Sequence, residues 1–496
     1  MNKRLFPTIL ITAAVILTNV IFFTPKAFAQ SSKDETVSAT LQARQYMELI
    51  TSVFNFVQNN YVDEVDPSVL YQGALKGMMD SLKDPYTSYL DTSQMRNLSD
   101  TTVGKFGGVG LSITKPVEST PEKPAYVEVA SPIEDGPGYK AGIQSGDFLT
   151  EIDGTPTPDI TMDEVLSKLR GTIGGSVTVK VKRGRNMQFS VTLVRELIEV
   201  PTEKYSIIEQ DAQIIGYLRI IEFTPQTAER VQEALDAFKK KSFTGMIIDL
   251  RNNPGGLITS VADVADKFID SGVIVTTKSR LASENVVFSA SKNKTTVPSG
   301  TPIVVLINKG SASASEILSG ALKDDHLAYL VGERTYGKGS VQQVIPLYND
   351  DGIKLTMARY YTPSDVNIDK IGIPPDLEVL FPELTDEEEK AYVDLLNSMV
   401  IENYVMDHAD MNESDISRYA GELAKTYNLT GSLLRRLVRL EVQRTKGTAT
   451  YDLDYDIQLN AAIDILKNGS FSQLIKNTKT LKDLQDEVIM RSEQLE

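Results

Sequence analysis

The spacing of apolar residues predicts two helices close to the N-terminal end of the chain. From Tyr46 to Val57 apolar residues recur every three or four positions, which is the period of a helix with one buried face. A second helix is predicted to begin at Asp66-Pro67, because proline suits the first turn, and to end near Lys83. These helices define a helical N-terminal region at 30–100, whose polar first residues are expected to form a linker.

Downstream, the apolar pattern changes twice. Between residues 101 and 197, short extended runs alternate with glycine and proline, which predicts a compact β-rich domain with one helix at Met162–Leu169. From 198 to 383, uninterrupted apolar runs alternate with amphipathic helices such as Thr227–Lys240, as in an α/β domain with buried parallel strands. The clearest of these runs are Met246–Leu250, Val273–Thr277, Ile303–Asn308 and Ala328–Val331. Residues 384–496 are charged and helical, and we expect them to pair with the N-terminal helices or with a second subunit.

The first 29 residues have the pattern of an export signal. Lys3 and Arg4 precede an apolar run from Leu5 to Phe23, and Ala27-Phe28-Ala29 follows as a small-residue cleavage site. The run is also long enough to span a bilayer, so residues 1–29 are either a cleaved signal peptide or a retained N-terminal membrane anchor. Both alternatives predict an exported protein, in the periplasm or on the cell-envelope side of the cytoplasmic membrane, because the positive end stays inside.

Composition narrows the chemistry. The chain has 496 residues with no cysteine and only two histidines, His326 and His408. Thiol catalysis, disulfides and cysteine-ligated metals are therefore excluded, and a histidine-rich metal site is not expected. A net charge of −16 argues against nucleic-acid binding, which needs a basic surface. We expect neither a metal nor another cofactor.

The β-rich domain carries two glycine-containing motifs in a characteristic order. Phe106-Gly-Gly-Val-Gly-Leu111 leads into an extended segment, and Ala141-Gly-Ile-Gln-Ser-Gly-Asp147 is followed by Ile152-Asp-Gly154. Together these motifs resemble a PDZ domain, which binds the end of a peptide. A glycine-rich turn can direct backbone N–H groups to a carboxylate, and the strand after it offers an edge to a guest strand.

The expected peptide-binding residues come from the turn, the strand after it and the facing helix. They are Gly107, Gly108, Val109, Gly110, Leu111, Ile113, Val165, Leu169 and Arg170. For Arg170 three roles remain open: it could face the guest carboxylate, tie the domain to the α/β core, or end the helix in solvent.

The α/β region contains a candidate nucleophile at a strand-to-helix turn. Gly310-Ser-Ala-Ser-Ala-Ser-Glu316 follows an apolar run and begins a helix, whose N-terminus favours negative charge. Taken alone, Ser313 and Glu316 fit a capping box better than a catalytic role. A serine nucleophile needs a base, and His326 lies in what looks like a solvated helix end, so a Ser-His-Asp triad is not expected.

A lysine can replace histidine as the base when its surroundings lower its pKa. Lys338 lies between two glycines in a segment that also follows an apolar strand, and Gln342 stands four residues on, where it could orient the lysine. If the strands are parallel, both loops reach the same edge of the sheet. A third loop there, Asn252-Asn-Pro-Gly-Gly256, can present backbone N–H groups to an oxyanion.

The complete set of motifs resembles the carboxyl-terminal processing peptidases, or tail-specific proteases. The resemblance runs from about Tyr46 to Phe381 and includes Asp84-Pro-Tyr-Thr87 besides the motifs above. It implies a PDZ domain before an α/β Ser-Lys protease core with helical N- and C-terminal regions. The roles it implies are Ser313 as nucleophile, Lys338 as base, Gln342 as the group orienting it, and Ala314 with Gly255 or Gly256 as the oxyanion hole.

The resulting hypothesis is a serine endopeptidase that binds the apolar C-terminal tail of an exported protein through its PDZ domain and cleaves it. We also expect a homo-oligomer, in the form of a dimer. The alternatives are a non-catalytic, membrane-proximal PDZ scaffold and a chaperone-like peptide binder. Both alternatives predict peptide binding without turnover.

Overall fold

The computed structural model describes residues 35–103, 105–116, 120, 124–133, 136–144, 146–183, 187–199, 201–211, 213–408, 410–446, 450–469 and 471–493. The predicted signal peptide or anchor at 1–29 lies outside the described residues. No helix within the described ranges is long and apolar enough to cross a membrane. The chain divides into two compact units: residues up to Met95 with Gln342–Thr356, and Arg96–Val341 with Met357 onward.

The first unit contains the two predicted helices. Helix α1 spans Glu35–Asn60, so it begins inside the segment that the sequence predicts as a linker. Helix α2 spans Pro67–Asp80 and ends slightly before the expected Lys83; the carboxylate of its N-cap Asp66 accepts the Ser68 N–H at 2.8 Å. Strand β1 (Ser88–Leu90) pairs antiparallel with Gly352, Ile353 and Lys354.

Much of the apolar stripe of α1 is exposed in the single chain. The exposed members are Leu41, Tyr46, Met47, Leu49, Ile50, Val53 and Phe56. The dimer stays a prediction.

The β-rich domain of the second unit is built from short strands, as the sequence predicts. The sheet has the order β3-β4-β5-β7-β8, with the two-residue β6 attached to β5, and β2 pairs separately with β9. The bounds are β2 Lys105–Gly108, β3 Leu111–Thr114, β4 Val127–Pro132, β5 Phe148–Ile152, β6 Thr155–Pro156, β7 Ser176–Arg183, β8 Met187–Val194 and β9 Glu196–Glu199. Helix α5 (Met162–Leu169) matches the prediction and begins with a capping box between Thr161 and Glu164.

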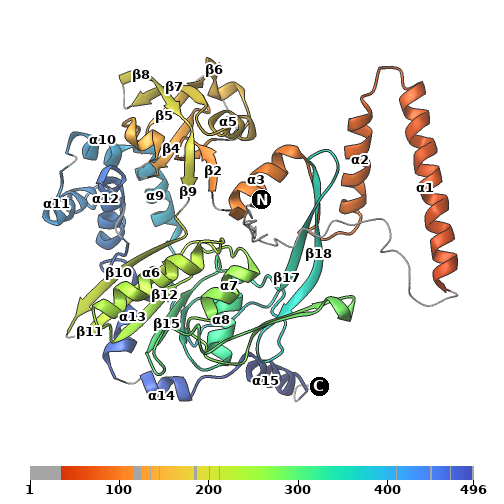
Figure 1. Ribbon diagram of the computed structural model, residues 1–496. Helices are drawn as coiled ribbons and strands as arrows, with labels where there is room; N and C mark the ends of the chain where they lie inside the picture. The colour runs from red at the N-terminus through yellow and green to blue at the C-terminus, as the bar shows by residue number, and fades with distance from the viewer. Residues whose placement is uncertain are drawn as a thin grey trace, which may run out of the picture. The chain divides into compact units, whose positions relative to one another are not determined.

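The α/β region is built on a six-stranded sheet of order β10-β11-β12-β15-β16-β19. Figure 1 labels β10, β11, β12 and β15 of this sheet. Strands β10 and β11 are antiparallel and all later neighbours are parallel. The bounds are β10 Glu203–Gln210, β11 Gln213–Ile220, β12 Gly245–Asp249, β15 Ile303–Ile307, β16 Tyr329–Gly332 and β19 Leu377–Glu378. The central strands β12 and β15 are buried at every position, which is why their sequences are apolar without alternation.

Helices cover both faces of this sheet. Helices α6 (Thr227–Lys240), α7 (Ile258–Ala265) and α8 (Ala314–Asp324) pack on one face in the largest hydrophobic cluster. The predicted run at 273–277 forms β13 (Val273–Ser279) outside this sheet. It pairs antiparallel with β14 (Val286–Ser289) and with Ala358–Tyr361, the second half of β18 (Gly352–Tyr361).

Some of the C-terminal helices pack against the six-stranded sheet. Helix α13 (Ile457–Lys467) covers the second face of the sheet, where Leu459 and Ile463 pack against Ile247 and Leu306. Leu481, at the start of α15 (Leu481–Glu493), packs in the cluster around α8. Helix α14 (Phe471–Lys476) joins the α13 cluster through Phe471, whereas α9 (Asp386–Ser398), α10 (Val400–Asp407), α11 (Glu413–Leu423) and α12 (Gly431–Lys446) form a cluster of their own. Residues 384–496 are predicted to pair with the N-terminal helices or with a second subunit. Part of this region instead covers the six-stranded sheet and completes the α/β sandwich.

Truncation of Leu459 tests this assignment. The side chain is fully buried against the sheet, so Leu459→Ala should lower the free energy of unfolding by about 2–5 kcal/mol. Leu396→Ala on α9, where the side chain is 43% exposed, is the matched control and should change it by less than about 1 kcal/mol. The measurement is urea denaturation, in which the unfolding transition of the second unit is followed. Equal, small effects of both variants would contradict the placement of α13.

Candidate active site

Three loops meet at one edge of the sheet because they leave three neighbouring parallel strands. The loop at 250–257 follows β12, the loop at 308–313 follows β15, and the loop at 333–339 follows β16. Strand β15 lies between the other two and is parallel to both. The expectation that the candidate serine and lysine loops reach the same edge is confirmed.

The outer serines of the Ser-Ala-Ser-Ala-Ser run hold the turn in place. Ser311 is fully buried and its hydroxyl donates to the Leu250 carbonyl at 2.8 Å. Ser315, also fully buried, donates to the Asn253 carbonyl at 3.0 Å. The two serines join the turn to the loop after β12. Ser313, between them, is only half-buried.

Ser313 has an unusual backbone conformation at the start of α8. Its φ is 54° and its ψ −112°, a region that residues with a side chain rarely adopt. Such strain persists only where the surrounding contacts enforce it, and it is concentrated at functional sites. The Ala314 N–H, the first of the helix, donates to none of the described residues. It is therefore available to an anion beside Ser313.

Glu316 connects the serine loop to the lysine loop. Its carboxylate is fully buried and accepts the N–H groups of Ser313 (2.9 Å) and Lys338 (2.8 Å) on the same oxygen, Oε2. The other oxygen, Oε1, accepts the Gly337 N–H at 2.7 Å and the Thr335 hydroxyl. The contact with Ser313, which the sequence predicts as a helix cap, is thus one of four hydrogen bonds to this carboxylate. The other three come from the lysine loop.

Burial dominates the electrostatics of this carboxylate. Loss of water raises the pKa of Glu316 above its ordinary value, and the hydrogen bonds from Thr335, Lys338, Gly337 and Ser313 offset this only in part. A buried charge without four donors would cost far more.

Tyr360 makes a second bridge between the same two loops. Its ring is 1% exposed, and its hydroxyl lies within hydrogen-bond distance of the Ser313 carbonyl (3.2 Å) and of the Lys338 carbonyl. The glycines on both sides of Lys338 allow close packing against the segment 368–372: a Cβ on Gly337 would lie 2.9 Å from the Gly372 nitrogen, and one on Gly339 would lie 2.6 Å from the Asp369 nitrogen. The backbone around Lys338 is therefore fixed from two sides.

The two glycines of the third loop differ in their N–H groups. The Gly255 N–H donates to the Asn253 side chain at 2.9 Å, whereas the Gly256 N–H donates to none of the described residues. A Cβ on Gly255 would lie 2.8 Å from the Ser313 Cβ and one on Gly256 2.2 Å from the Phe223 oxygen, so both positions require glycine. Of the two, Gly256 has the N–H that can bind an oxyanion without first breaking a hydrogen bond.

A buried ion-pair network anchors this loop to the C-terminal helices. The Arg251 guanidinium pairs with Asp249 and with Asp456, each at 2.6 Å, and donates to Gln458 at 3.0 Å. Burial alone would raise the pKa of Asp249, but Arg251 and the Tyr217 hydroxyl outweigh it and hold that pKa below its ordinary value. The loop after β12 is thus connected to the N-terminus of α13.

Gln342 belongs to the first unit. It is half-buried, and its Nε2 donates to the Thr356 hydroxyl at 3.3 Å. Thr356 in turn contacts the Asp84-Pro-Tyr-Thr87 segment. Gln342 thus lies four residues from Lys338 in the sequence. Through Thr356 it is also linked by hydrogen bonds to Asp84, more than 250 positions earlier.

The predicted peptide-binding residues divide between surface and core. Leu111 and Ile113 lie half-buried on β3, which is an edge strand of its sheet among the described strands. Val165 and Leu169 are 0% and 3% exposed and pack in the domain's core instead of lining an open groove. The Arg170 guanidinium lies 4.4 Å from the centre of the Phe106 ring, beside the glycine-rich loop.

The first half of that glycine-rich loop is extended. Gly107 and Gly108 belong to β2 and pair with Leu197 and Glu196 of β9. Val109 and Gly110 are buried. The Gly107 carbonyl also accepts the N–H of Gly171, just after α5, at 3.0 Å.

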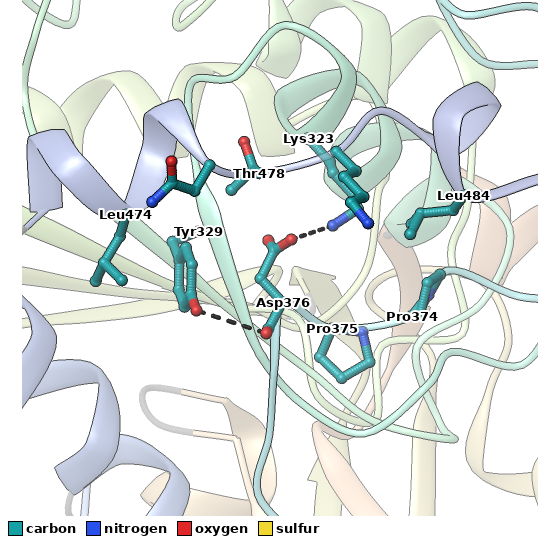
Figure 2. A pocket seen from close by; sticks show the side chains of 10 residues that line it. Lys323, Tyr329, Pro374, Pro375, Asp376, Leu474, Thr478 and Leu484 are labelled. Carbon is teal, nitrogen blue, oxygen red and sulfur yellow. Dashed lines mark hydrogen bonds and ion pairs between the residues drawn. The ribbon is translucent and has the colours of Figure 1, made fainter. Parts of the chain in front are cut away.

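A cavity of about 270 Å³ lies at the opposite end of α8 from Ser313. Figure 2 shows Lys323 paired with Asp376, whose backbone oxygen accepts the Tyr329 hydroxyl. Lys323 is 1% exposed, and the negative end of the helix dipole at the C-terminus of α8 stabilises its positive charge. His326, the histidine closest in sequence to Ser313, also lies at this end, where its Nδ1 is 2.7 Å from the Thr478 hydroxyl. Neither the cavity nor this histidine belongs to the serine site.

This architecture defines a class of protein, a PDZ domain followed by a serine peptidase domain. Residues 128–183 match the family model of the PDZ domain and residues 214–379 match that of peptidase family S41. Residues 10–94 match the N-terminal domain of the activating protease CtpB.

Known proteins place the chain within this class. The carboxy-terminal-processing protease of Bartonella bacilliformis is 38% identical over 387 residues, which are 76% of this chain and 86% of that protein. CtpB of Bacillus subtilis is 32% identical over 70% of this chain and 71% of its own length. The solved photosystem II D1 C-terminal processing protease is 30% identical, with a TM-score of 0.41 over 67% of this chain and 92% of that one. The chain belongs to the carboxy-terminal processing proteases of family S41.

Substitution of Glu316 by glutamine tests its role as the link between the loops. The amide keeps the shape but replaces one acceptor oxygen with a donor, so one or two buried N–H groups lose their partner. We expect a loss of about 1–3 kcal/mol in the free energy of unfolding, together with a fall in proteolytic rate. Glu333→Gln is the control. Glu333 lies in the lysine loop, and among the described residues its carboxylate forms a 3.6 Å ion pair with the exposed Lys309. Wild-type stability and rate in Glu316→Gln would refute the role.

Proposed function

We propose that this protein is a serine endopeptidase in which Ser313 is the nucleophile, Lys338 the general base and Gln342 the residue that orients the lysine. The observation that carries the proposal is the double bridge between the two loops. Glu316 and Tyr360 each contact the backbone of both Ser313 and Lys338. Family membership and the strained backbone of Ser313 support the same assignment.

In the proposed mechanism, neutral Lys338 takes the hydroxyl proton of Ser313 as the serine oxygen attacks the scissile carbonyl. Negative charge then develops on the carbonyl oxygen, where the Ala314 and Gly256 N–H groups would donate to it at the positive end of α8. Collapse of this intermediate expels the amine, which takes a proton from Lys338. Water then releases the acyl group by the same steps.

Substrate selection is assigned to the PDZ domain. Among the described strands β3 lies at the edge of its sheet, where a guest strand can be added, and Leu111 and Ile113 give it an apolar surface. We therefore infer that protein substrates with apolar C-terminal tails bind there. The predicted export segment would place the reaction outside the cytoplasm, either free or beside the membrane.

Two single substitutions test the catalytic pair. Ser313→Ala and Lys338→Ala should each lower the rate of peptide cleavage by about a thousandfold or more. Lys309→Ala is the control lysine, since its side chain is 86% exposed in the serine loop, and it should cleave at the wild-type rate. The measurement is initial rate on a fluorogenic peptide with an apolar C-terminus, with and without a chelator. Undiminished cleavage by Ser313→Ala would reject the mechanism, and binding without any cleavage by the wild type would favour the scaffold.

Amidation of the substrate's C-terminus tests the recognition step. The amide removes the charge that the glycine-rich loop is proposed to bind, so kcat/KM should fall by about tenfold, a loss near 1.4 kcal/mol. Two peptides that differ only at this group are compared on the same enzyme. Equal kcat/KM values would show that the carboxylate is not recognised.

A further inference from the structure

A cavity of about 130 Å³ in the second unit is lined by arginines from three separate elements. Tyr217, whose ring packs in the same hydrophobic cluster as α13, forms part of its wall, so the cavity lies beside the six-stranded sheet. Its volume is below the roughly 300–1,000 Å³ of sites for drug-sized ligands, which limits an occupant to a small group. The charged residues of this arginine pocket are Arg219 on β11, Arg251 in the loop after β12, Arg436 and Arg439 on α12, Asp452 and Asp456.

Two of the four arginines already have acidic partners. Besides its pair with Asp249, Arg251 pairs with Asp456 at 2.6 Å, and Arg439 pairs with Asp452 at 2.9 Å. The further acidic partners of Arg439 are Glu413 and Asp454. Ion pairs of this kind hold the planar guanidinium group in one orientation. Both aspartates of the pocket are therefore neutralised by arginines, so their charge does not by itself exclude an anion.

The other two arginines have no acidic partner among the described residues. Arg219 is half-buried and donates no hydrogen bond to any residue that the structure describes. Arg436 is also half-buried; its guanidinium lies 4.2 Å from the centre of the Tyr455 ring and forms no ion pair within the described ranges. Stacking uses the face of a guanidinium and leaves the N–H groups at its edge able to donate. Both guanidinium groups thus present donors that no described residue accepts.

A lysine adds to the positive charge at Arg219. Lys204 on β10 stands directly opposite Arg219 in the antiparallel ladder, so both side chains lie on the same face of the sheet. Burial lowers the pKa of Lys204 below its ordinary value, and the charge of Arg219 lowers it further. Like charges directly opposite each other destabilise a sheet. An anion bound at Arg219 would offset this repulsion.

From these observations we propose that the arginine pocket binds a phosphate-type anion, with Arg219 and Arg436 as its direct ligands. A phosphate group has oxygens on several sides, so it can accept from guanidinium groups that approach from a strand and from a helix. A carboxylate has two oxygens in one plane and suits a single guanidinium fork. The bound anion would join the sheet to α12, which otherwise packs in a separate helical cluster. This site is independent of the proposed function, because peptide cleavage consumes no phosphate.

The test is calorimetric titration of the full chain with inorganic phosphate, at an ionic strength held constant with chloride. The wild type should bind one phosphate with a saturable isotherm. Arg219→Gln and Arg436→Gln should each weaken this affinity by about tenfold or more, because each removes charge-assisted hydrogen bonds. Arg418→Gln on α11 is the matched control, since that side chain is 63% exposed and pairs with Asp415 of its own helix. Equal affinity in the wild type and both pocket variants would overturn the proposal.

Thermal unfolding of the same proteins guards against misfolding. In chloride alone, Arg219→Gln should unfold at the wild-type temperature or above it, because the substitution removes the like charge opposite Lys204. Phosphate at about five times its Kd should raise the Tm of the wild type by about 2 °C and that of the two pocket variants by much less. A lower Tm of Arg219→Gln in chloride, with an undiminished phosphate shift, would assign Arg219 a structural role and reject the site.

A comparison of three anions identifies the source of the phosphate group. Tighter binding of glycerol 3-phosphate than of inorganic phosphate would indicate the phosphate of a larger molecule, and the reverse order would indicate the free ion; both results support the site. Acetate binding as tight as that of phosphate would contradict the choice of a phosphate-type anion. Ser313→Ala should bind phosphate like the wild type, so failure of this site and failure of the proposed peptidase mechanism are separate results.

Discussion

The site depends on one buried carboxylate. Glu316 has no exposed surface, and all four of its hydrogen bonds come from the two loops that carry Ser313 and Lys338. A buried charge is tolerated only when its oxygens are fully hydrogen-bonded. The cost of leaving Glu316 unsatisfied therefore disfavours any conformation in which the two loops separate. Tyr360, which contacts the carbonyls of both residues, adds a neutral bridge with the same effect.

The sheet topology makes this carboxylate effective. Three adjacent parallel strands deliver three loops to one edge, and α8 starts at that edge with Ser313 at its N-terminus. The other end of α8 is held by the buried Lys323–Asp376 pair and by α15. On the far face, α13 covers the sheet and supplies Asp456 to the Arg251 network. The C-terminal helix α13 thus stabilises the strands and the loop after β12 at the same time.

Local patterns were sufficient to predict the elements of the site, and long-range partners were not. Helices α5 and α6 match their predicted bounds, and β12, β15 and β16 lie within one residue of theirs, because burial on both faces leaves an uninterrupted apolar run. Glu316 was interpreted as a cap because Ser313 is the one partner within its own turn; Thr335, Gly337 and Lys338 lie about twenty residues away. Tyr360 carries no sequence signal, because it contacts Ser313 and Lys338 from β18, 47 and 22 positions further along the chain. The packing of α13 was also missed, because an amphipathic stripe does not identify the surface that it covers.

Because the chain has only two histidines, the proposed base is a lysine, and the contacts that fix the lysine loop bear directly on its chemistry. An imidazole is close to neutral at physiological pH, whereas a lysine must be deprotonated and held in one direction before it can act as a base. Its long side chain has several rotatable bonds, so orientation must come from the surroundings. In this chain the lysine's backbone is fixed by Glu316 and by the close packing of Gly337 and Gly339. In the proposed mechanism, Glu316 therefore gives Lys338, through its backbone, part of the orientation that a carboxylate gives directly to the side chain of a histidine base.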